Sequence, residues 1–139
     1  MRKHPTLKRH EALAKTIETY RNKPFVWGKS DCMKLARTHV RNMGHRPPAS
    51  PPYSSIVGAR TALKKTGFDT LEGLLDSLLP RITPAAMLPG DIGLIEHPES
   101  PFDSVVISLG RKVFCWHEDA ETPVMLSIGA GDIKAAWRT

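Results

Sequence analysis

The stretch PFVWGKSDC, residues 24–32, decides how the chain is interpreted, because an aromatic turn leads here into a helix that begins with a cysteine. Ser30 and Asp31 are both good N-cap residues. We expect the helix to run from Cys32 to Met43 and to stop at Gly44, since glycine readily adopts the left-handed conformation that ends helices. This interpretation places Cys32 at the N-terminus of a helix.

A cysteine in that position is a candidate nucleophile. Unpaired N–H groups and the positive end of the helix dipole favour the thiolate and lower the pKa of the thiol. The alternative is that Cys32 is a small buried apolar residue, as free cysteines often are. With Cys115 as the only other cysteine, the chain has no disulfide framework, and free thiols suit a reducing compartment.

A nucleophilic thiol also needs a base, and histidine is the usual one. His39 lies seven residues beyond Cys32 on the same helix, roughly 10 Å along the axis, which excludes it. His97 in a turn and His117 at the end of a predicted strand remain as candidates that can approach Cys32 from a sheet. Of these two, His117 has the stiffer support.

Helical patterns dominate the first 80 residues. An amphipathic helix is predicted from Thr6 to Arg21, with an apolar side formed at helical spacing by Leu7, Ala14, Ile17 and Tyr20. Residues 45–54 (HRPPASPPYS) contain four prolines and predict a surface loop. A third helix is expected from Ser55 to Thr66, and a fourth, capped by Asp69, continues to Pro80.

After Pro84 the pattern changes to short apolar or alternating runs, which are typical of strands. Gly110 to Lys112 is a short connection that predicts a hairpin. Helices followed by a meander indicate a single α+β domain over residues 1–139. The expected strands are Asp91–Glu96, Ser104–Leu109, Val113–His117, Val124–Ile128 and Ile133–Trp137.

Charge is unevenly distributed along the chain. The net charge of +6 divides at Thr66 into 15 − 3 = +12 before that point and 5 − 11 = −6 after it. One interpretation is that the two halves attract each other within the fold, and the other is a partner of complementary charge. Residues 1–9 form a basic leader, for which we expect an acidic neighbour as the partner.

Several function classes are excluded or disfavoured. No apolar run approaches the ~18 residues of a membrane span, and no phosphate-binding or dinucleotide motif is present, so neither a membrane partner nor a cofactor is predicted. Cys115, His117 and Asp119 alternate along one strand, but ligands so close together do not form a closed tetrahedral site, and no metal is predicted. Nucleic-acid binding stays a weak alternative because aromatic platforms are sparse among the basic residues.

The motifs together resemble the NlpC-type cysteine peptidases, a papain-like superfamily that cuts cell-wall peptides. The resemblance is closest to a small phage-tail branch and covers roughly residues 20–139. It rests on four segments in order, which are Pro24 to Cys32, Gly90 to Ile95, Gly110 to His117, and Ala136-Trp137-Arg138. It implies a papain-like α+β fold in which helices pack on a small antiparallel sheet.

One departure from that family bears on activity. The resemblance places the catalytic histidine at the start of the hairpin's first strand, where this chain has Ser104. The family's catalytic triad also has a third polar residue, which orients the base, and the resemblance places it on the neighbouring strand at Trp116 or His117. His117 therefore either keeps this orienting role or replaces the base. The candidate catalytic residues are therefore Cys32 and His117.

From this resemblance we expect a structural protein of the phage tail tip or baseplate, made in the host cytoplasm and incorporated into the virion. Its partners would be other tail-tip or hub proteins and peptidoglycan, and its role tail assembly or penetration of the host wall. One alternative is an active cysteine peptidase or amidase that cleaves peptidoglycan peptides. A second is a basic adaptor that binds nucleic acid.

Overall fold

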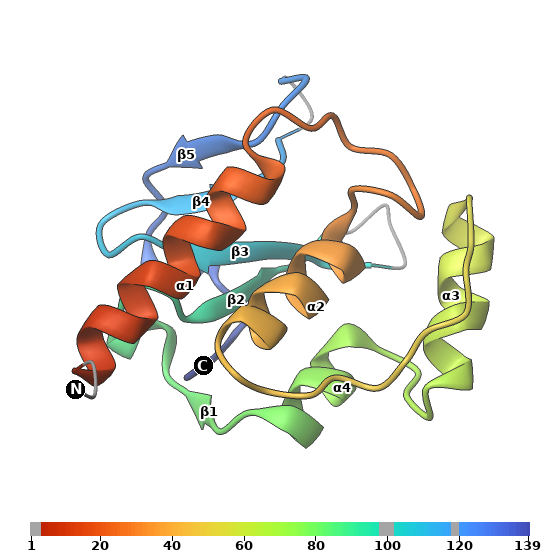
Figure 1. Cartoon of the computed structure of the whole chain (residues 1–139), viewed down its shortest axis with the longest axis horizontal. Helices are drawn as coiled ribbons and strands as arrows, with labels where there is room; N and C mark the ends of the chain where they lie inside the picture. Colours follow the sequence, from red (N-terminus) through yellow and green to blue (C-terminus); the bar gives the residue numbers. More distant parts are fainter. Residues whose placement is uncertain (1–3, 98–101, 118–119) are drawn as a thin grey trace.

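The fold is given by a computed structural model that describes residues 4–97, 102–117 and 120–139. The α-helices come first in the sequence and the strands of the sheet follow them, as the sequence predicted (Figure 1). The elements are α1 (Pro5–Tyr20), α2 (Cys32–Asn42), α3 (Ile56–Lys65), α4 (Leu71–Leu78), β1 (Arg81–Ile82), β2 (Ile92–Ile95), β3 (Ser104–Ser108), β4 (Val113–Cys115), β5 (Val124–Leu126) and β6 (Ala135–Trp137), with 3-10 turns at Pro84–Ala86 and Ala130–Asp132.

The six strands form one antiparallel sheet in the order β1-β6-β2-β3-β4-β5. The β3–β4 hairpin turns at Gly110, as expected, and the Leu109 N–H donates to the Lys112 carbonyl across the turn. All five expected strands are present but shorter at one or both ends. The two-residue β1 was not expected, because such a short strand leaves no periodic pattern.

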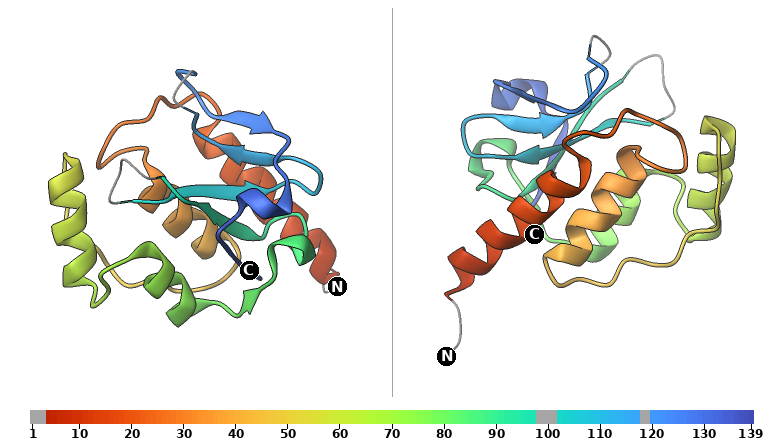
Figure 2. Two further views of the ribbon diagram at one scale, coloured as in Figure 1. Left: turned by 180° about the vertical axis from the view of Figure 1, so that it is seen from behind. Right: turned by 45° about the horizontal axis from the view of Figure 1, so that its top comes forward.

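Helices α1 and α2 pack side by side across one face of the sheet, while α3 lies to one side of it (Figure 1). The main core lies between these layers and includes Leu35, Val40, Ile107, Phe114 and Trp137. Seen from behind, the other face carries the 3-10 turns rather than the long helices (Figure 2). A small cluster of Val106, Val113 and Cys115 is buried on that side.

The face by which α1 packs differs in part from the expectation. Its buried residues are Ala12, Thr16 and Tyr20. Leu7, which the periodicity placed on the apolar side, is 50% exposed. Thr16 is buried instead because its hydroxyl hydrogen-bonds within the fold, to the Ala12 carbonyl and to His39 Nδ1.

The helix boundaries follow the capping residues closely. Of the two expected caps, Asp31 rather than Ser30 caps α2, which ends before Gly44, whose φ is +95°. Ser55, expected as the first residue of the third helix, is the N-cap of α3. The cap of α4 is Thr70, whose hydroxyl accepts from the Gly73 N–H, so the assignment to Asp69 was wrong by one residue. Both residue types are good caps, and sequence alone did not separate adjacent ones.

Two expectations about segments are answered by the structure. Residues 45–54, the expected proline-rich loop, contain neither helix nor strand. Of the expected basic leader, residues 1–3 lie outside the described residues. Pro5 to Arg9 belong to α1, and Arg9 forms an ion pair with buried Asp91. None of the helices in the described ranges combines the length and the apolar character that crossing a bilayer requires.

Candidate functional site

The turn before α2 is held by the carboxylate of Asp31, which is fully buried. One oxygen accepts from the Lys34 N–H at 2.8 Å and caps the helix, while the other accepts from the Gly28 N–H at 2.7 Å. The Tyr53 hydroxyl, from the proline-rich loop, donates to both oxygens at 2.8 and 3.0 Å. Asp31 therefore fixes the start of α2, and with it the position of Cys32.

Gly28 is required by this arrangement for two reasons. Its φ is +86°, a conformation that favours glycine, and a Cβ atom placed there would lie 1.8 Å from the backbone oxygen of Tyr53. The turn thus brings the loop backbone directly against Gly28. The glycine at position 28 is therefore a packing requirement.

Cys32 lines a cavity of about 350 Å³ between the start of α2 and the strand ends β3 and β4. A larger open groove, about 720 Å³, lies beside α1, but no cysteine or histidine lines it in the described part of the chain. The Cys32 cavity is therefore the candidate functional site. Its lining residues are Phe25, Trp27, Cys32, His97, Phe102, Asp103, Ser104, Trp116, His117 and Ala120.

The electrostatics of Cys32 differ from the sequence expectation. Burial raises the pKa of the Cys32 thiol to about 12, with smaller upward contributions from Asp31 and Cys115. The Val105 N–H donates to the sulfur at 3.5 Å and acts in the opposite direction, but it is outweighed. The predicted lowering of this pKa by the helix N-terminus was wrong, because desolvation penalises the thiolate more than the helix end favours it. Cys32 carries a protonated thiol at neutral pH.

Ser104 occupies the position that the resemblance assigns to the base. It is the first residue of β3 and lines the cavity, and the next residue, Val105, contacts the Cys32 sulfur through its backbone. A serine hydroxyl has no basic lone pair that titrates near neutral pH, so it does not replace an imidazole. The structure thus places Ser104, which is not a base, close to Cys32.

The two histidines left open by the sequence both line the same cavity. His97 follows β2 and His117 follows β4, and both are exposed. Within the part of the chain that the structure describes, the hydrogen bond to the Cys32 sulfur comes from Val105 and not from an imidazole. The histidines are therefore close enough to share a cavity with the thiol, without being hydrogen-bonded to it in this conformation.

His39, excluded on spacing, is held elsewhere by the fold. Its Nε2 lies 2.6 Å from the Gly90 carbonyl oxygen, and its Nδ1 lies 2.7 Å from the Thr16 hydroxyl. A carbonyl only accepts, so the ring proton resides on Nε2. Burial lowers the pKa of His39 to about 4, and the ring is neutral at pH 7.

Aromatic side chains form one wall of the cavity, which the sequence did not indicate. Phe25 makes edge-to-face contacts with Trp27 and with Trp116, at centroid distances of 4.9 and 5.5 Å. Trp27 in turn lies 5.5 Å from Phe102. These rings come from three separate segments, and no local spacing connects them. The wall offers an apolar surface beside the thiol.

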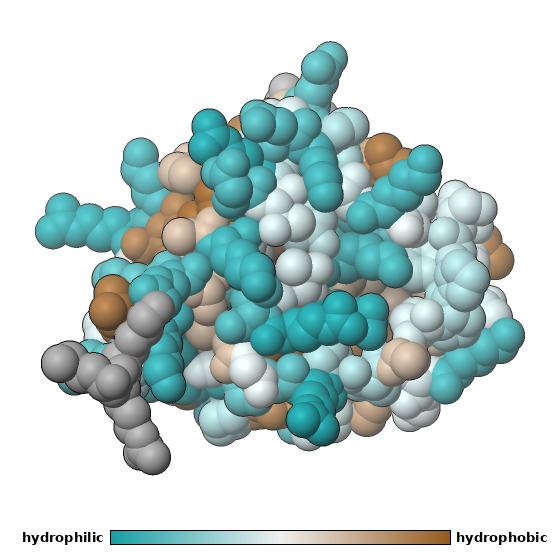
Figure 3. All heavy atoms as spheres, viewed as in Figure 1, coloured by the Kyte–Doolittle hydropathy of each residue, from teal (hydrophilic) through white to brown (hydrophobic). Residues whose placement is uncertain are grey.

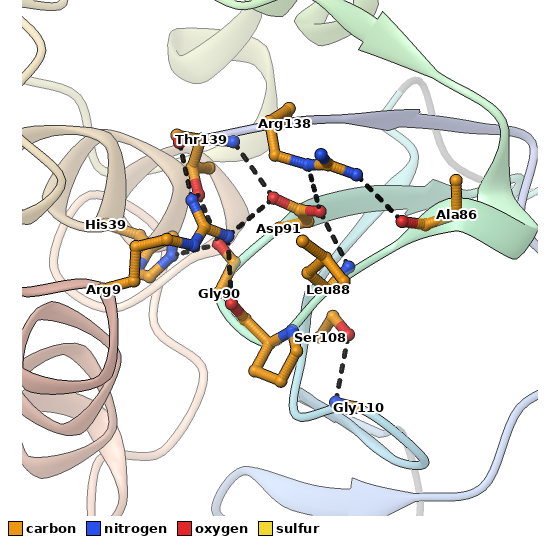
Figure 4. A network of polar contacts seen from close by, with 11 residues as sticks. Arg9, His39, Ala86, Leu88, Gly90, Asp91, Ser108, Gly110, Arg138 and Thr139 are labelled. Atoms are coloured by element: carbon orange, nitrogen blue, oxygen red, sulfur yellow. Dashed lines mark hydrogen bonds and ion pairs between the residues drawn. The ribbon is translucent and has the colours of Figure 1, made fainter. Parts of the chain in front are cut away.

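A second cluster of polar contacts explains two more of the motifs (Figure 4). The fully buried carboxylate of Asp91 forms ion pairs with Arg9 and Arg138, each at 2.9 Å. It also accepts from the backbone N–H groups of Leu88 at 2.8 Å and Thr139 at 3.1 Å. The segments Gly90 to Ile95 and Ala136 to Arg138 therefore bind each other through Asp91 and Arg138, and the contacts of Asp91 tie α1 and β6 to the start of β2.

The described residues include no candidate metal site. Among residues 4–97, 102–117 and 120–139, no group of three or more histidine, cysteine or acidic side chains is placed to hold an ion. Cys115 is buried on the far face of the sheet from the helices, and burial raises the pKa of its thiol to about 11. Asp119, the third residue of the alternating set, lies outside the described residues.

Fold and site together define an α+β protein in which a cysteine at a helix N-terminus faces a cavity at the end of an antiparallel sheet. The chain belongs to the family described as a domain of unknown function (DUF6950), which matches residues 5–139. No curated protein and no solved structure matches the chain.

Proposed function

We propose that this protein is a structural component of a phage tail tip or baseplate that retains the NlpC-type fold but has lost efficient peptidase activity. The proposal rests on the four-segment resemblance, and the arrangement around Cys32 supports it. In such a protein the papain-like domain serves assembly, or contact with the host wall, rather than turnover. The cavity beside Cys32 then acts as a binding site.

The observation that carries the loss of activity is Ser104. It lines the cavity next to the cysteine, in the strand position where the related peptidases have a base. A cysteine peptidase needs a thiolate to attack the carbonyl and an acid to protonate the leaving amine. Cys32 has a raised pKa, and Ser104 provides neither the base nor the acid.

An active cysteine peptidase is the second candidate, and one observation favours it. His97 and His117 line the Cys32 cavity and lie on the segments that follow β2 and β4. A shift of either imidazole into hydrogen-bonding distance of the sulfur would form a catalytic pair. Cys32 would then be the nucleophile and a histidine the base.

Incubation of the purified protein with peptidoglycan separates the two candidates. We expect the wild-type protein and Cys32→Ala to release equal, background amounts of soluble fragments, with Cys115→Ala as the matched control for loss of a thiol. Release by the wild type and Cys115→Ala, but not by Cys32→Ala, would establish the peptidase instead. Ser104→His tests the role of the missing base, and we expect it to increase the rate at which Cys32 is alkylated at pH 7.

The tail-tip role is tested separately. A phage deleted for this gene should form infectious particles when complemented with the wild type or with Cys32→Ala, and mass spectrometry should detect the protein in purified virions. Normal particles without any complementation would contradict the structural role. Rescue by the wild type but not by Cys32→Ala would show that the thiol is essential.

A further inference from the structure

The charge division in the sequence is not neutralised within the fold. Among the described residues, one ion pair, Arg9 with Asp91, joins the basic first part to the acidic second part. Asp91 also pairs with Arg138 of its own half, and the other acidic residues after Thr66 with a described ion pair are bound by Arg81 and Lys134, again of that half. Attraction between the halves therefore does not account for the excess of positive charge.

That excess is concentrated in residues 32–66, which contain seven lysines and arginines and no acidic residue. The segment comprises α2, the proline-rich loop and α3, which follow one another along one side of the molecule (Figure 1). None of its cations forms an ion pair with another described residue. Hydrophilic side chains extend across the helical side (Figure 3).

Three cationic side chains lie on one side of α2, and the packing around two of them holds them in place. Lys34, Arg37 and Arg41 lie at intervals of three and four residues, about 4.5 and 6 Å along the axis, and form what we term the α2 basic face. The Lys34 ammonium lies 5.4 Å from the centre of the Tyr53 ring. The Nε of Arg37 is buried and has no hydrogen-bond partner in the described part of the chain.

These contacts hold the charged groups in place without neutralising them. An uncompensated, partly buried guanidinium is unfavourable unless an anion approaches it. A second copy of this chain is a poor source of that anion. Glu72, Asp76, Asp91 and Asp103 already form ion pairs within their own molecule, and the exposed Asp69, Glu96, Glu121 and Asp132 come from four separate segments rather than from one acidic stretch. The partner is therefore a different molecule.

We propose that the α2 basic face is an interaction surface for an acidic segment of another protein. Carboxylates about one helical turn apart match the spacing of Lys34, Arg37 and Arg41. Nucleic acid fits less well, because the sole aromatic residue of residues 32–66 is Tyr53, whose ring faces Lys34 and whose hydroxyl binds Asp31. Bases would find no stacking surface there.

The test measures binding of the full-length protein to fluorescently labelled poly-L-glutamate by anisotropy, at about 50 mM salt where exposed charges are weakly screened. Oligo(dT) of equal charge is the competing probe. We expect Lys34→Gln/Arg41→Gln to weaken poly-L-glutamate binding about tenfold, since each exposed ion pair contributes modestly. Arg111→Gln/Lys112→Gln is the matched control, because it removes one arginine and one lysine from the exposed turn between β3 and β4 and should weaken binding less than twofold.

Three results would overturn the proposal, namely no binding to poly-L-glutamate, equal weakening by both double variants, and tighter binding to oligo(dT) than to poly-L-glutamate. The charge-conserving variant Lys34→Arg/Arg41→Lys should retain binding, which distinguishes lost charge from damaged folding. None of these outcomes depends on Cys32, so the surface and the proposed function can fail independently.

Discussion

The reactivity of Cys32 is the most direct test of how this site works. The structure gives the thiol a pKa of about 12, which is three units above the ordinary value of 9.0. Each unit changes the thiolate fraction tenfold at a pH below both values, so folded Cys32 carries about 1,000 times less thiolate than an unperturbed cysteine. Since the thiolate is the reacting species, alkylation should be slowed by about the same factor.

The perturbation is denaturation, in a Cys115→Ala background that leaves Cys32 as the single thiol. Iodoacetamide adducts are quantified by mass spectrometry between about pH 7 and 9, for the folded protein and for the protein in urea. We expect the folded protein to react about 1,000-fold more slowly than the unfolded one, with a rate that rises tenfold per pH unit and reaches no plateau. An exposed single-cysteine peptide provides the reference rate.

A folded protein that reacts faster than the peptide at pH 7 would refute this reasoning. It would show that the helix N-terminus or a histidine activates the thiol despite its burial, and it would favour the peptidase. A plateau in the rate near neutral pH would lead to the same conclusion, because it would locate the pKa there.

Two further predictions concern the buried polar groups. Asp91→Asn should lower the free energy of unfolding, measured in urea, by about 3–5 kcal/mol, because it leaves Arg9 and Arg138 without their shared carboxylate. The control Glu18→Gln removes an exposed ion pair with Arg21 and should lower it by under about 1 kcal/mol. A loss below about 1 kcal/mol for Asp91→Asn would contradict the structure. Burial lowers the pKa of His39 to about 4 in the folded protein, against 6.5 in the unfolded chain. Between these two pH values the unfolded chain binds a proton at His39 and the folded protein does not. The free energy of unfolding should therefore fall by up to about 3 kcal/mol as the pH is lowered from above 6.5 to about 4. The urea midpoint of His39→Gln should therefore depend less on pH over this range than that of the wild type, and equal pH dependence would argue against a buried neutral histidine.

Much of the fold was predictable because its signals are local. Helix caps such as Asp31 and Ser55, and the left-handed Gly44 and Gly110, mark where elements begin or end. Alternating apolar residues located the strands from β2 onward. The pairing of β6 with β1 and β2 was not predictable, because strand order depends on contacts between residues far apart in the sequence.

The candidate site was predicted in part. Sequence placed Cys32 on the helix start and left His97 and His117 as candidates, and all three line one cavity. The raised pKa of Cys32 was not predictable, because desolvation depends on what packs over the sulfur from β3 and not on its neighbours in the chain. The papain-like identity of the fold, and the roles of Cys32 and His117, remain predictions.

The position of β6 has a consequence for how the protein reaches its folded state. β6 is the last strand in the sequence, yet it lies between β1 and β2, which have no pairing with each other. Until β6 arrives, the apolar edge of β2, with Ile92 and Leu94, is open to strands of other molecules. Yield on refolding should therefore fall steeply as protein concentration rises, since intermolecular strand addition competes with the insertion of β6.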